Sequence, residues 1–150
     1  MLRRRFVVGL TGAGLALSQA EALAQAAFST APIAPQNPLE ADFVAAFDSE
    51  AMRPVFRARF LESQVALAME SAAPDASPLK RPVRGAPSAL IYTSPARLAN
   101  VLGESAAYQE MTGREALERL RGGPAAINFG LAPMLTLEAE DVDRFLLIPG

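Results

Sequence analysis

The chain of 150 residues contains no cysteine, no histidine and no tryptophan. Without cysteine it has no disulfide, no thiolate metal site and no thiol nucleophile. Without histidine it has neither an imidazole metal ligand nor the histidine that activates a catalytic serine. These absences exclude the commonest metal centres and hydrolase sites, and we expect a protein without a cofactor.

A strong excess of one charge is also missing. The chain has 14 basic and 16 acidic residues, which gives a formal net charge of −2. Proteins that bind DNA or RNA neutralise phosphates with a basic face, which a mildly acidic chain does not supply. We therefore expect no nucleic acid among the partners.

The first 26 residues have the layout of a bacterial signal peptide. Three arginines at positions 3–5 precede an uncharged, mostly apolar run that begins at Phe6. A membrane-spanning helix needs about 20 apolar residues, and this run is shorter. Ala24 and Ala26 each complete an Ala-x-Ala cleavage site, of which the later is the expected one. The sequence predicts a cleaved signal and no transmembrane segment in the mature protein.

The residues before Phe6 indicate the export route. Arg3 and Arg4, followed by Arg5 and Phe6, resemble the twin-arginine signal of bacteria. Export by the Sec pathway is the alternative. Either route predicts a periplasmic or secreted protein.

The mature chain opens with a segment that has no hydrophobic period. Residues 27–37 are rich in proline and alanine, which predicts a disordered tether. Asn37 and Pro38 are typical of a helix cap and a first helical residue. We expect a helix from there to about Asp48, and a folded domain over residues 38–150.

A second helix is expected from just before Pro54, because proline is tolerated only in the first turn. The apolar residues Val55, Phe56 and Phe60 are predicted to face inward. Residues 71–87 contain four prolines and predict an exposed, extended loop.

Four short apolar runs predict strands, at residues 65–69, 89–93, 107–111 and 124–129. The last three each lead into a short helix, with the expected caps Ser94, Thr112 and Thr136. A strand followed by a helix three times over is typical of helices packed on a sheet. We predict an α/β fold, with α+β as the alternative. A small mixed sheet of about four strands should pack with short amphipathic helices and two N-terminal helices.

Several short motifs follow one another in the chain: Leu-Ile-Tyr-Thr-Ser at 90–94, Gly-Arg at 113–114, Gly-Gly-Pro at 122–124, Ile-Asn at 127–128 and Leu-Thr at 135–136. Their order and spacing resemble the N-terminal domain of the SseB (enhanced serine sensitivity) family over about residues 38–147. Tyr92 stands where the family more often has Phe, and Phe129 follows Asn128 where Pro is usual. The resemblance implies an α/β domain with no established activity and no known catalytic residues.

Three residues at strand ends are candidate contacts for a ligand or partner: Tyr92, Ser94 and Asn128. Backbone N–H groups beside Ser94 could hold an anion, although helix capping explains the same residue. Asn128 could bind a ligand or close a turn on its own backbone. Four acidic residues within 138–143 do not have the spacing of a calcium loop and are typical of a helix N-terminus, so we expect no metal site.

Two classes of function remain open. The first is a non-catalytic interaction or ligand-binding module whose partner is an unknown protein or small ligand. The alternative is a small hydrolase that uses carboxylates, or a serine with Lys80, which is the only lysine. A proline-rich loop is a poor place for a preorganised base, so the first class is preferred.

Overall fold

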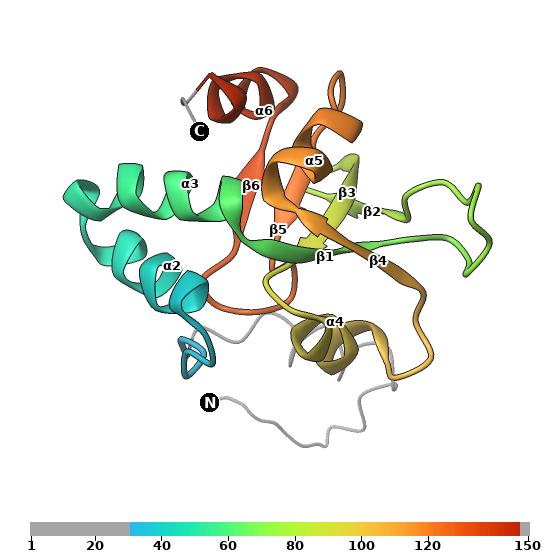
Figure 1. The fold of residues 1–150 in the computed structure, drawn as a ribbon, viewed down its shortest axis with the longest axis horizontal. Coiled ribbons are helices and arrows are strands. Elements are labelled where there is room, and N and C mark those ends of the chain that lie inside the picture. Colours follow the sequence, from blue (N-terminus) through green and yellow to red (C-terminus); the bar gives the residue numbers. More distant parts are fainter. Residues whose placement is uncertain (1–30, 148–150) are drawn as a thin grey trace.

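The computed structural model describes residues 31–147, which form a six-stranded sheet with helices on both faces (Figure 1). The helices are α2 (Pro38–Asp48), the short 3-10 helix η1 (Glu50–Met52), α3 (Arg53–Glu62), α4 (Pro95–Leu102), α5 (Gly113–Arg119) and α6 (Ala139–Leu146). The strands are β1 (Gln64–Ala68), β2 (Lys80–Val83), β3 (Ala86–Tyr92), β4 (Tyr108–Thr112), β5 (Ala125–Ile127) and β6 (Leu135–Leu137). The predicted α/β fold is confirmed. Within residues 31–147, no helix combines the length and the hydrophobicity needed to cross a membrane.

The sheet is mixed, as predicted. Its strand order is β4-β1-β3-β5-β6. The remaining strand, β2, pairs with β3 on the same side as β1. Among the described strands, only β3 and β5 pair in parallel, with Leu90 opposite Ala126. The other pairs, including the long β1–β4 ladder, are antiparallel. The sheet has six strands where about four were expected, because β2 and β6 were missed.

The second half of the expected loop at 71–87 is instead a β-hairpin, so that prediction was wrong there. Arg84 and Gly85 have φ values of 51° and 83°, which are those of a two-residue type I′ turn between β2 and β3. In such a hairpin the pair next to the closing pair is not hydrogen bonded across the strands. Pro82 and Pro87 face each other at that position, so neither removes a ladder hydrogen bond.

The predicted cap of the last helix was also wrong. Thr136 lies in β6, opposite Ala126 of β5. The helix α6 begins three residues later, where Glu138 and Asp141 each accept a hydrogen bond from the other's backbone N–H. The acidic residues of this segment therefore cap a helix, which the sequence also allowed.

The two N-terminal helices form largely as expected. Asn37 caps α2, and its Oδ1 accepts a hydrogen bond from the Glu40 N–H at 2.8 Å. In α3, Phe56 and Phe60 are buried one turn apart, but Val55 is 44% exposed. A helix turns about 100° per residue, so Val55 is rotated away from the face that Phe56 and Phe60 share. Its predicted inward orientation was wrong.

The central strands are buried on both faces. In β1, Val65 and Leu67 belong to a cluster with α2, α3, α5 and α6, whereas Ala66 and Ala68 belong to a second cluster with α4. Successive strand residues point to opposite faces, which explains the alternation. Figure 1 shows α4 across the sheet from α5 and α6. The fold is a sheet between two helical layers.

The N-terminal predictions fall mostly outside the described residues. The signal peptide with Arg3, Arg4 and Phe6, and the cleavage sites at Ala24 and Ala26, lie there. Of the tether predicted at 27–37, the structure describes residues 31–37. The Ile33 N–H donates to the Ala132 carbonyl at 2.8 Å, and the Ala34 carbonyl accepts from Arg97 Nη2 at 2.6 Å. This part of the segment is bound to the domain.

Candidate functional site

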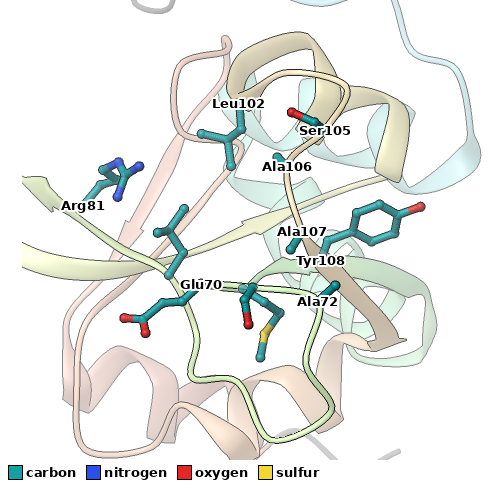
Figure 2. A pocket seen from close by; sticks show the side chains of 11 residues that line it. Glu70, Ala72, Arg81, Leu102, Ser105, Ala106, Ala107 and Tyr108 are labelled. Carbon is teal, nitrogen blue, oxygen red and sulfur yellow. The ribbon is translucent and has the colours of Figure 1, made fainter.

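A pocket of about 640 Å³ lies at the end of β1, where the chain leaves the sheet. We call it the edge pocket. Its walls come from three segments: residues 69–72 after β1, Leu79 and Arg81 at β2, and Leu102 with residues 105–108, from the end of α4 to the start of β4. Figure 2 shows Arg81 and Tyr108 on opposite sides of this pocket.

The walls are held together by backbone hydrogen bonds. The Met69 N–H donates to the Ala107 carbonyl at 3.0 Å, which joins the first segment to the third. The Leu79 N–H donates to the Ala68 carbonyl at 2.9 Å. The chain thus leaves the sheet after β1 and makes a loop. It then re-enters the sheet as β2, which pairs with β3 on the same side as β1 does. This loop projects beyond the end of the sheet in Figure 1.

The edge pocket combines apolar, polar and charged groups. Met69, Leu79 and Leu102 supply its apolar surface, while Glu70 and Arg81 carry opposite charges on exposed side chains. Because the charges balance, the pocket does not select an ion of one sign. Such a surface suits a polypeptide side chain with polar neighbours.

The edge pocket adjoins a sheet edge. Tyr108 lines the pocket, is 42% exposed and is the first residue of β4. Among the described strands, β4 pairs only with β1, so its outer side carries backbone groups without a strand partner. An edge of this kind can accept an added strand.

The three residues predicted as contacts for a ligand or partner instead make hydrogen bonds within the protein. Tyr92 is buried and its hydroxyl donates to the Phe129 carbonyl at 2.8 Å; burial raises the pKa of this phenol. Ser94 caps α4, where its hydroxyl accepts from the Arg97 N–H at 3.1 Å. Asn128 is buried in the left-handed conformation at φ 58°. None of the three lines the edge pocket.

The structure nevertheless brings two of the predicted strand ends together. Asn128 Oδ1 accepts from the Thr93 N–H at 3.0 Å, and Asn128 Nδ2 donates to Thr93 Oγ1 at 3.1 Å. The two turns therefore meet beneath the surface, where their side chains satisfy each other. Capping and turn closure account for Ser94 and Asn128 in this geometry.

Sequence reasoning missed a buried ion pair at the same place. Glu40 is 0% exposed and Arg97 is 8% exposed. Arg97 Nε and Nη2 donate to the two carboxylate oxygens of Glu40, both at 3.0 Å, and Thr93 Oγ1 donates to Glu40 Oε2 at 2.6 Å. We call Glu40, Thr93, Arg97 and Asn128 the Glu40 cluster. It joins α2, α4 and the ends of β3 and β5.

The charge of Glu40 is maintained by its partners. Burial alone would raise the pKa of this carboxyl, but hydrogen bonds from Arg97, from Thr93 and from the Gln36 backbone lower it below the ordinary value. One sequence signal could have revealed the pair. Glu40 follows Leu39 and lies three residues before Phe43 on the inward side of α2, where an acid needs a partner.

The remaining candidates from the sequence lie apart from the edge pocket or do not cluster. Within residues 31–147, no group of three or more acidic side chains is placed to hold a metal ion. Lys80, considered as a base for a hydrolase, is exposed at the start of β2 and does not line the edge pocket.

No protein-family model, curated protein or solved structure matches the chain. The resemblance to the SseB family therefore stays a prediction from the motifs. Any function has to be inferred from the residues and their geometry.

Proposed function

We propose that the protein is an exported, non-catalytic interaction module of the SseB N-terminal-domain type that binds an extended segment of a partner protein. One observation carries the proposal: the edge pocket opens at the beginning of β4, which is an outer strand of the sheet. The export signal at residues 1–26 and the family-like motifs support the other parts of the proposal.

Binding to β4 would use two kinds of contact. An added strand hydrogen bonds to the backbone of the edge, which supplies affinity without sequence preference. Five residues of β4 extend over about 17 Å, enough for several such bonds. A side chain near one end of the bound segment would enter the edge pocket, which supplies specificity.

The walls indicate which side chain fits. Leu79 and Leu102 offer apolar contact, and Tyr108 offers an exposed ring and hydroxyl. Beside these residues, the negatively charged Glu70 can accept hydrogen bonds and the positively charged Arg81 can donate them. An apolar anchor residue flanked by polar residues matches this arrangement.

Site-specific photocrosslinking in the producing cells tests the proposal. A photoreactive phenylalanine analogue at Tyr108 should form a discrete crosslinked product. The same analogue at Glu50, an exposed residue of η1, is the matched control and should form none. Arg81→Glu, which reverses an exposed charge at the pocket, should reduce the Tyr108 product severalfold. No product at Tyr108, or equal products at both positions, would contradict the proposal.

A further inference from the structure

A second cavity, of about 430 Å³, lies between α2, α3, α6 and residues 133–135, which lead into β6. We call it the helix pocket. Phe43, Phe56 and Phe145 form much of its wall, and all three are buried. Phe47 also lines it and is 64% exposed. The helix pocket shares no lining residue with the edge pocket, so it is a separate site.

Among residues 31–147, the charged residues that line the helix pocket are both arginines. Arg53 uses its Nε to donate to the Ala46 carbonyl at 3.2 Å. Arg57 differs, because its Nε is buried and has no hydrogen-bond partner among the described residues. Its guanidinium carbon lies 5.9 Å from the ring centroid of Phe145.

A buried N–H of a charged group without an acceptor is rare in folded proteins and costs free energy. An acceptor in the helix pocket would remove that cost once the Arg57 side chain turns its Nε toward the pocket. None of the described lining residues is acidic, so these residues supply no carboxylate. A ligand with an anionic oxygen would complement this wall, and the phenylalanines require the rest of that ligand to be apolar.

We propose that the helix pocket binds a medium-chain fatty acid, with its carboxylate on Arg57 and its hydrocarbon chain against Phe43, Phe56 and Phe145. The volume is in the range of small-molecule sites, which are mostly apolar with a few polar groups. Most of the lining comes from helices, and only Leu135 of the described lining residues belongs to a strand, β6. Phe47 also lines the pocket, and its exposed ring offers the chain a further apolar contact.

Calorimetric titration with three ligands that share one hydrocarbon tail tests the site. Decanoate, decanol and decyltrimethylammonium are used below the concentrations at which they form micelles. Decanoate should bind, decanol should bind about tenfold more weakly, and the cation should not bind. Equal affinity for decanoate and decanol, or no binding of decanoate, would overturn the proposal.

Arg57→Met removes the guanidinium and keeps much of the apolar stem. It should abolish the preference for decanoate over decanol and leave the affinity for decanol unchanged. The control is Arg59→Met, a substitution on the same helix that changes the net charge equally. This variant should keep the preference for decanoate over decanol. Urea unfolding of each variant confirms that it is folded. Loss of the preference in both variants would show a general charge effect and would overturn the assignment to Arg57.

A second copy of the chain could cover the helix pocket instead of a ligand. Analytical ultracentrifugation without ligand separates the two cases. The proposal requires a monomer whose mass is the same for the protein and for Phe47→Ser. A dimer that dissociates in Phe47→Ser would overturn it.

Discussion

Glu40 and Arg97 form an ion pair that is almost fully shielded from water. Both carboxylate oxygens of Glu40 accept hydrogen bonds from the Arg97 guanidinium. They also accept hydrogen bonds from the Thr93 hydroxyl and from the Gln36 backbone N–H. Such a pair is costly to desolvate, but it becomes far more costly when one partner is removed. The pair also links segments that are 57 residues apart in the chain.

Arg97→Met should therefore destabilise the protein by about 3–5 kcal/mol, because Glu40 would stay buried without its partner. Urea unfolding followed by circular dichroism measures the change. The control is Arg121→Met, which breaks an exposed ion pair with Asp143 and should cost less than about 1 kcal/mol. Similar costs for the two variants would contradict the role assigned to the pair.

The cost of Arg97→Met should also depend on pH. In the wild-type protein the pKa of Glu40 is lowered, so its contribution is complete above the ordinary value of 4.5 and is lost as the pH falls below it. In the variant, burial without Arg97 favours the neutral acid. The difference in unfolding free energy between the two proteins should shrink between pH 7 and pH 3. A difference that stays constant would exclude Glu40 as its source.

At the scale of elements, α5 begins in close contact with the end of α3. The Gly113 N–H donates to the Ser63 carbonyl at 2.9 Å. A Cβ at Gly113 would overlap the carbonyl oxygen of Phe60, which belongs to the backbone and cannot turn aside. A glycine is therefore required where the Thr112 and Glu115 capping box meets α3.

Gly113→Ala should lower the unfolding free energy by about 3 kcal/mol, because the helix start must move away from α3. Gly123→Ala is the matched control, since nothing lies within 4 Å of a Cβ there. Thermal unfolding of both variants provides the measurement. A Gly113→Ala variant as stable as Gly123→Ala would contradict this account of the contact.

Elements with their own caps were predictable, and elements without local signals were not. Asn37, Ser94 and Thr112 cap the helices that the sequence assigned to them. The strands β2 and β6 have four and three residues, and each is defined by its neighbour in the sheet. Pro82 in β2 and Thr136 in β6 favoured other interpretations when no partner strand was known.

At the scale of the whole molecule, packing has to hold the fold, because a chain without cysteine has no disulfide. One apolar cluster lies on each face of the sheet, and the Glu40 cluster joins helices from both faces. The edge pocket and the helix pocket lie on different elements of this core. Changes in one pocket can thus be tested without altering the other.

The proposed export concerns the whole protein, and its predicted signal lies outside the described residues. Replacing Arg3 and Arg4 with lysine should abolish export, because the twin-arginine route requires the arginine pair. Cell fractionation and immunoblotting of the full chain measure it. Deletion of residues 6–20 is the control that should block either route. Unchanged export of the lysine variant would indicate the Sec route and leave the signal itself intact.

The sequence by itself determined the α/β class, most helix boundaries and the inward faces of most helices, because caps and hydrophobic periods act over a few residues. Only the tertiary structure decided the pairing of β2 and β6, the partner of Glu40 and the composition of the two pockets. Arg97 reaches Glu40, and Ala107 reaches Met69, through contacts between segments that no local pattern connects. Tyr92, Ser94 and Asn128 could be recognised as strand-end residues, but the burial of Tyr92 and Asn128 depended on what packs over them.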